Sequence, residues 1–211
     1  MDSTALLLVF MNPPADDLSA WNAWYDDEHV PNRLATPGIL SGARYSAVWE
    51  TGPRYMAVYD LAGLETLQTP DYKRLGAERS EREKAQIART PMVDRRILRV
   101  VHGAPPVSEP PAYQLSVAMD PASGTDEDYL AWYADEHIPM LLEVPGWRRV
   151  RVFEQVDGNG PRFMALHELE SPAVFDEDAY RKATSTPWRD RVVAGVTRRE
   201  RGLFKRYVPA S

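Results

Sequence analysis

The chain contains one stretch of its own sequence twice, and this repeat limits the fold more than any other feature. The segment at 24–31 reads WYDDEHVP, and the segment at 132–139 reads WYADEHIP, at a shift of 108 positions. At that same shift, without gaps, 19 of the 51 residues from Met11 to Leu61 are identical to their counterparts. Agreement over a stretch of this length indicates a duplicated unit. We therefore expect two copies of one structure.

A proline-rich segment separates the two copies. Residues 103–112 contain four prolines, which is typical of an extended, semi-rigid linker. The predicted organisation is a first repeat at 1–102, this linker, and a second repeat at 113–211.

The two copies differ in length near their ends. Thr90-Pro91 matches Thr186-Pro187 at a shift of 96 rather than 108. Because 108 − 96 = 12, this match predicts a twelve-residue insertion in the first repeat, after about Arg74.

Each repeat shows the same order of predicted elements: a strand, a helix, two strands, a helix and a strand. In the first repeat, apolar patterning and turn residues predict strands at 5–11, 43–49, 54–61 and 96–102, and helices at 16–29 and 64–88. Pro31 and Pro139 are expected to end the first helix of each copy, because a residue before proline disfavours the helical conformation. This order is that of the ferredoxin-like βαββαβ unit.

Such a unit leaves one face of its sheet uncovered. Two copies can bury these faces against each other. The predicted fold is therefore α+β, with two ferredoxin-like βαββαβ repeats forming an intramolecular pseudo-twofold α+β barrel. The usual dimer would then be satisfied within one chain, and a further homodimer stays open.

Composition excludes several classes of function. The chain has 211 residues with 25 basic and 31 acidic side chains, a net charge of −6, and this acidity does not favour a nucleic-acid partner. It has no cysteine, which excludes disulfides and thiolate metal sites.

The apolar run at 5–11 is far shorter than the ~20 residues that cross a membrane, so we expect a cytoplasmic protein without a membrane partner. Residues 181–211 carry nine basic and two acidic side chains, either a solvated basic face or an attraction for an anionic ligand.

The WYxDEH[VI]P stretch, the Pro-Gly pair after it and the βαββαβ order resemble the dimeric α+β barrel superfamily, and most closely its EthD-like and stress-responsive proteins. The resemblance covers nearly the whole chain. It implies the barrel fold, normally built from two chains. Its relatives include polyketide cyclases, muconolactone isomerases, cofactor-free monooxygenases and haem enzymes, so the resemblance leaves the reaction open.

Two histidines occupy the same position in the two copies. Helical spacing places Trp21, Tyr25 and His29 in a stripe along one face of the predicted helix. The second copy repeats this stripe with Tyr129, Tyr133 and His137. Such a stripe predicts a flat pocket for an aromatic ligand, with imidazole as general acid or base. The resemblance implies that this histidine lies between helices and sheet. Core packing with a structural histidine is the alternative, because duplication copies either kind of residue.

The third strand supplies the other candidate groups. Strand alternation predicts that Tyr59, and its counterpart His167, face the same cavity as the histidines. We take His29, Tyr59, His137 and His167 as the candidate catalytic residues. As Tyr/His and His/His pairs, they resemble in kind the Tyr/His pairs of olivetolic-acid-type cyclases. Of the two copies, the one with His167 is expected to be better suited to proton abstraction, because a neutral tyrosine is a poor base. Arg54 and Arg162, after Gly-Pro, could bind a substrate carboxylate or pair with acidic residues.

No cofactor or metal is expected. Consecutive helical residues point about 100° apart, so Asp-Glu-His is a poor chelating set, and the chain has no dinucleotide or phosphate-binding motif.

The leading prediction is a cofactor-independent lyase or isomerase, performing cyclisation, dehydration, decarboxylation or isomerisation on a small aromatic, lactone or polyketide-like molecule. Two alternatives remain. One is a cofactor-free monooxygenase of a hydroxylated aromatic. The other is a non-catalytic, stress-associated barrel protein that binds a small hydrophobic ligand.

Overall fold

Eight antiparallel strands pair edge to edge around a closed barrel in the computed structural model, which describes residues 3–103 and 109–209. The order around the barrel is β1-β3-β2-β8-β5-β7-β6-β4. The strands are β1 Ala5–Asn12, β2 Ile39–Ala47, β3 Tyr55–Leu61, β4 Met92–His102, β5 Tyr113–Asp120, β6 Trp147–Asp157, β7 Phe163–Leu169 and β8 Arg198–Arg206. Half of the expected linker, residues 104–108, lies outside the described residues.

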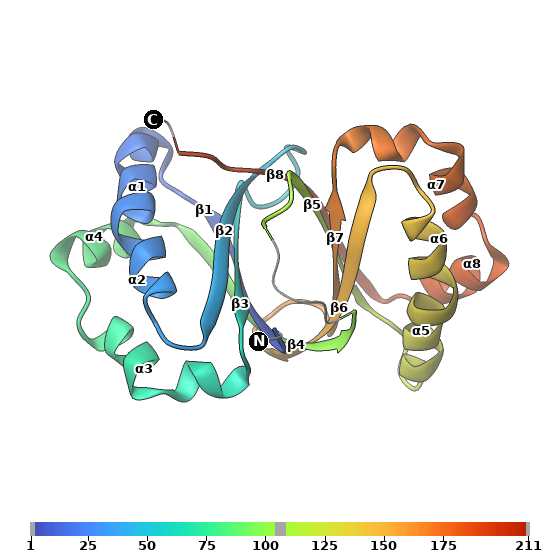
Figure 1. Ribbon diagram of the computed structural model, residues 1–211, viewed down its shortest axis with the longest axis horizontal. Coiled ribbons are helices and arrows are strands. Elements are labelled where there is room, and N and C mark those ends of the chain that lie inside the picture. The colour runs from blue at the N-terminus through green and yellow to red at the C-terminus, as the bar shows by residue number, and fades with distance from the viewer. Residues whose placement is uncertain (1–2, 104–108, 210–211) are drawn as a thin grey trace.

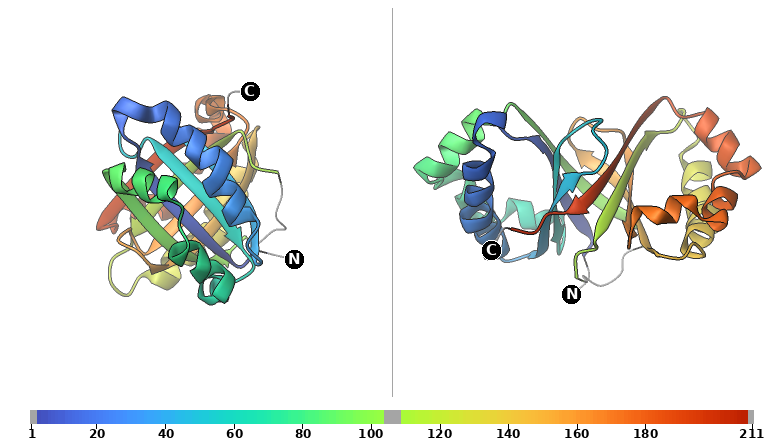
Figure 2. Two further views of the ribbon diagram at one scale, coloured as in Figure 1. Left: turned by 90° about the vertical axis from the view of Figure 1, so that its left-hand side faces the viewer. Right: turned by 90° about the horizontal axis from the view of Figure 1, so that it is seen from above.

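Helices cover the barrel on two opposite sides (Figures 1 and 2). One layer belongs to the first half of the chain, and the other to the second half. The helices are α1 Leu18–Trp24, α2 Val30–Leu34, α3 Pro70–Ala77, α4 Glu81–Arg89, α5 Asp126–Trp132, α6 Ile138–Leu142, α7 Asp178–Ala183 and α8 Pro187–Ala194. Within the described residues, none of these helices has the length and apolar character needed to cross a membrane.

Each half contributes four neighbouring strands to the barrel. The first half supplies β4-β1-β3-β2 and the second supplies β8-β5-β7-β6, and the halves join where β2 pairs with β8 and β4 pairs with β6. The predicted α+β barrel within one chain is thus confirmed.

The core has three parts, one inside the barrel and one under each helix layer. Alternation along β1 serves two of them: Leu6, Leu8 and Phe10 belong to the barrel interior, whereas Leu7 and Met11 belong to the core under the first helices. Because both faces of β1 are buried, its sequence is a continuous apolar run rather than an alternating one.

Ion pairs between the two halves cross the barrel interior. The Arg96 guanidinium on β4 lies 2.6 Å from the Glu200 carboxylate on β8, and Arg151 on β6 lies 2.5 Å from Asp60 on β3. Both arginine side chains are at most 5% exposed. These pairs tie the halves together where their sheets face each other.

The first helix of each half continues past its proline, which corrects one expectation. Residues 25–29 form a π-helical turn, in which the Val30 amide donates to the Tyr25 carbonyl, and α2 then runs to Leu34. Pro31 lies in the first turn of α2, where a helix tolerates proline. The second half repeats this geometry at 133–142.

The predicted twelve-residue insertion is wrong. The second helical region of each half begins after a capping residue, Ser80 before α4 and Thr186 before α8, and 186 − 80 gives a shift of 106. The first half is therefore only two residues longer. Thr90-Pro91 leads into β4 whereas Thr186-Pro187 starts α8, so their match does not join equivalent positions. The expected helix at 64–88 is divided into a 3-10 turn, α3 and α4.

Candidate functional site

Two equivalent cavities lie between the helices and the outer face of the barrel, one in each half. The first has a volume of about 180 Å³ and the second about 50 Å³. Predicted residues lining the first are Trp21, Tyr25, His29 and Tyr59, and those lining the second are Tyr133, His137 and His167. The structure therefore brings the predicted histidines and the third-strand residues to common cavities, and the first has the space for a ligand.

The π-helical turn sets the position of His29 in the first cavity. Its ring lies 5.0 Å from the Trp24 ring, five positions earlier, and 4.6 Å from the Tyr25 ring. An uninterrupted α-helix would bring residues three or four apart together, so spacing alone did not identify Trp24. π-helical turns are rare and occur frequently at functional sites.

A carboxylate holds the His29 imidazole. His29 Nδ1 lies 3.3 Å from Oε1 of Glu83, a buried residue of α4. Hydrogen bonding to His29 lowers the pKa of Glu83, so the carboxylate is ionised and accepts from Nδ1–H. Burial lowers the pKa of His29 below its usual 6.5. At neutral pH the ring is therefore uncharged, and Nε2 carries the lone pair of a base.

Sequence analysis missed Glu83 because it is one of several acidic residues in a highly charged predicted helix, and helical spacing does not single it out. The available signal was a capping box: Ser80 accepts a hydrogen bond from the Glu83 amide at 2.9 Å, and the two residues have the spacing S-x-x-E.

Two tyrosines form another wall of the first cavity. Tyr59 Oη lies 3.5 Å from Tyr25 Oη, and both side chains are buried. Burial raises the pKa of Tyr59 well above 10 and also raises that of Tyr25. Both phenols are therefore neutral and able to donate a hydrogen bond.

The second cavity is packed more tightly and has different electrostatics. His137 stacks on Trp132 at 4.4 Å, and burial lowers its pKa to about 4 despite a hydrogen bond to the Ala183 backbone. The pKa of His167 is also well below 6.5 because of burial. The position equivalent to Glu83, at a shift of 106, is Arg189, which lowers the pKa of His137 further. Among the described residues of this half, no carboxylate is paired with His137.

The remaining predicted ligand-binding residues lie outside both cavities. Tyr129 stacks on Phe163 at 5.2 Å. Arg54 donates to the Pro13 carbonyl at 2.5 Å, and Arg162 forms an ion pair with Asp126. Both arginines hold the connection between first strand and first helix.

The glutamate of the repeated DEH sequence connects two helical regions. Glu28 accepts a hydrogen bond from the Ser80 hydroxyl, and Glu136 accepts one from Thr186 at 2.5 Å. Because these hydroxyls also cap α4 and α8, the motif fixes where each second helix begins. Among the described residues, no group of three His, Asp or Glu side chains could hold a metal ion.

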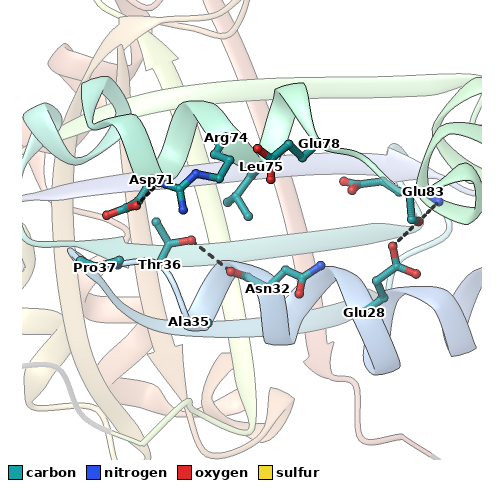
Figure 3. Close-up of a pocket in the computed structure, with 11 residues that line it drawn as sticks. Glu28, Asn32, Ala35, Thr36, Pro37, Asp71, Arg74, Leu75, Glu78 and Glu83 are labelled. Atoms are coloured by element: carbon teal, nitrogen blue, oxygen red, sulfur yellow. Dashed lines mark hydrogen bonds and ion pairs between the residues drawn. The ribbon is translucent and has the colours of Figure 1, made fainter.

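A polar groove of about 480 Å³ lies beside the first cavity, between α2 and the α3–α4 region (Figure 3). Its acidic residues are Glu28, Asp71, Glu78 and Glu83. Glu83 lines this groove and also bonds His29, which lines the cavity, so one carboxylate connects the two.

Comparisons with known proteins identify the fold. No family model and no curated protein matches the chain. A solved structure of an anthrone oxidase-like protein is 14% identical with a TM-score of 0.68, covering 98% of this chain and 92% of that one. A candidate monooxygenase from Lactobacillus acidophilus is 11% identical, with a TM-score of 0.61 and coverage of 97% and 94%. A haem-binding protein from Thermus thermophilus is 12% identical, with a TM-score of 0.59 and coverage of 99% and 92%. The chain shares the fold of these structures, a closed α+β barrel, and nothing in the comparisons points to EthD-like proteins in particular.

The haem-binding neighbour makes haem a cofactor to test against this chain. Cofactor pockets usually have volumes of about 300–1,000 Å³, whereas the two cavities have about 180 and 50 Å³. These cavities do not fit a haem.

Proposed function

We propose that the first-half cavity is the active site of a cofactor-free monooxygenase that acts on a small hydroxylated aromatic molecule. The observation that carries this proposal is the pair His29–Glu83, a neutral base at the wall of an aromatic-lined cavity. The similar structures described as an anthrone oxidase-like protein and a candidate monooxygenase support the same chemistry. They give no support to the lyase or isomerase prediction, which this proposal replaces.

The first step is removal of a proton from the substrate hydroxyl by His29 Nε2. The ionised Glu83 stabilises the imidazolium that forms, as the acidic member does in a catalytic triad. Deprotonation makes the aromatic ring electron-rich, so the phenolate can reduce dioxygen. General base catalysis of this kind contributes about 10²–10⁴ in rate.

The oxygen step needs no further reductant. One electron passes from phenolate to dioxygen, and the superoxide and phenoxyl radicals combine with a C–O bond at a ring carbon that carries hydrogen. Loss of that hydrogen then cleaves the O–O bond and leaves a quinone carbonyl. Overall, a phenol and O₂ give a quinone and water, so the substrate loses four electrons and O₂ gains four. The imidazolium returns its proton to the departing oxygen. Tyr25, whose hydroxyl accepts the hydrogen bond from Tyr59, keeps its own proton to donate to that oxygen.

Product analysis under isotopically labelled dioxygen tests the proposal. The protein, free of metal and flavin, is mixed with gentisate, a dihydroxybenzoate, and we expect one labelled atom in the quinone and one in water. Protein carrying His29→Ala controls for spontaneous oxidation. A product formed without oxygen uptake would restore the lyase or isomerase reading, and saturable binding without any product would indicate a binding protein.

We also propose that each half is a ferredoxin-like repeat and that the barrel arose by tandem duplication. The identical element order in the halves, the shared π-helical turn and the paired contacts Glu28–Ser80 and Glu136–Thr186 support this origin.

A further inference from the structure

The wall of the first cavity is cationic. Its lining includes Arg33 on α2, Arg79 in the α3–α4 connection and Arg95 on β4, and none of its lining residues is Asp or Glu. Arginine side chains present planar donors that match a carboxylate in two-point geometry.

Two of these guanidinium groups have no carboxylate of their own. Arg95 is 3.6 Å from Asp157 and donates to Tyr72 Oη at 3.4 Å. Arg33 lies over the Tyr72 ring at 5.4 Å, and within the described ranges neither it nor Arg79 forms an ion pair. Both lower the pKa of Glu83, the carboxylate already held by His29. Apart from this attraction to Glu83, neither guanidinium is held in an ion pair with a carboxylate of the described residues, so its donors are available to a ligand.

The second half shows the same bias with different residues. Its cavity is lined by Arg189, Arg199 and Arg201, again without Asp or Glu. At the shift of 106 only Arg201 has an arginine, Arg95, as its counterpart in the first cavity. The positive charge recurs although most of the arginines stand at different positions, which points to a property of the cavities rather than to copying alone. These three arginines of the second cavity belong to the basic segment 181–211, so part of that segment's charge lies at the cavity.

We propose that the ligand of the first cavity is an aromatic acid whose carboxylate binds Arg33 and Arg79 while its ring packs against Trp24 and Tyr25. The oxidation of this ligand rests on the proposed function, but its binding does not. A cationic wall also favours the phenolate that deprotonation by His29 creates.

A matched ligand pair tests this inference without turnover. Binding of gentisate and of its neutral amide, gentisamide, is measured under anaerobic conditions by quenching of tryptophan fluorescence. We expect gentisate to bind about tenfold more tightly, the difference that one charge-assisted hydrogen bond supplies, and its advantage to shrink at high salt. The variants Arg33→Gln and Arg79→Gln should each remove most of this preference.

Arg74→Gln is the control, because Arg74 lies on α3 but lines the groove and pairs with Asp71 at 2.8 Å. It should leave the preference unchanged, and melting temperatures identify any variant that fails to fold. Equal affinity for the two ligands, no binding of either, or a preference that survives both arginine variants would overturn the inference. Tight, charge-dependent binding without oxygen uptake would support it and contradict only the proposed function. Oxygen uptake with both ligands, bound at equal affinity, would support the proposed function and contradict this inference.

Discussion

At the scale of single residues, the difference between the two halves lies in what supports each histidine. His29 has Glu83, whereas His137 has a backbone group and the nearby charge of Arg189. Sequence analysis identified both histidines from the repeat, but not their partners. The third strand suggested the second half as the better site, because His167 stands there at the position that Tyr59 occupies in the first half, and a neutral tyrosine is a poor base. Cavity volume and the position of Glu83 instead favour the first half.

Activity should depend on pH through His29. Its pKa in the folded protein is below 6.5, so the neutral base is present at neutral pH and is lost as the pH falls through that lower pKa. Glu83→Gln removes the charge that favours the imidazolium. We expect kcat/KM to drop at least tenfold and the acid limb of the pH profile to move to lower pH. An unchanged limb would show that Glu83 does not act on His29.

Stability should depend on pH through His137. Its folded pKa of about 4 is below the unfolded value of 6.5, so the unfolded chain binds a proton more readily. The contribution is full above pH 6.5 and is lost as the pH falls toward 4, by up to about 3 kcal/mol. Denaturant unfolding of the protein and of His137→Phe across this range checks it. A variant that loses stability as steeply as the natural protein would contradict the assignment.

At the scale of elements, the helix–sheet cavity depends on two local features that periodicity does not reveal. One is the π-helical turn, which keeps the helix intact across Pro31 and moves His29 onto Trp24. The other is the hydroxyl cap, which fixes α4 to Glu28 and so positions Glu83. The order of strands and helices was predictable from apolar patterns. The break between α3 and α4 was not, because the charged segment has a helical composition throughout.

The two caps provide a matched pair of variants. Removing a capping hydroxyl costs about 1 kcal/mol, so Ser80→Ala and Thr186→Ala should destabilise the protein similarly in thermal unfolding. Only Ser80→Ala should also reduce oxygen uptake, because the histidine proposed as the base, His29, has its carboxylate partner Glu83 on α4. Equal effects on activity would mean that the position of α4 is not what matters.

At the scale of the whole molecule, the repeat predicted the barrel, but not how its interior is closed. Local patterns cannot show which charges meet across a barrel, since Arg151 and Asp60 are 91 residues apart in the chain. Their pair and the pair Arg96–Glu200 make the interface between the halves partly ionic. The halves should therefore unfold together rather than separately.

Breaking one pair tests this coupling. Arg151→Met leaves Asp60 without its partner in a buried site, and a loss of about 3–5 kcal/mol in unfolding free energy is expected. Adding Asp60→Asn should recover part of this loss, because it removes the uncompensated charge. A loss below about 1 kcal/mol, or two separate unfolding transitions in the natural protein, would show that the halves are independent.

The central claim, that His29 in the first half activates an aromatic substrate toward oxygen, is tested most directly by an oxygen electrode. Protein free of metal and flavin is supplied with gentisate, and His29→Ala is compared with its counterpart His137→Ala. The account predicts that His29→Ala lowers the rate of oxygen uptake by about 10²-fold or more with the melting temperature retained, whereas His137→Ala keeps most of the rate. Full activity in His29→Ala, or its loss in His137→Ala alone, would contradict the account.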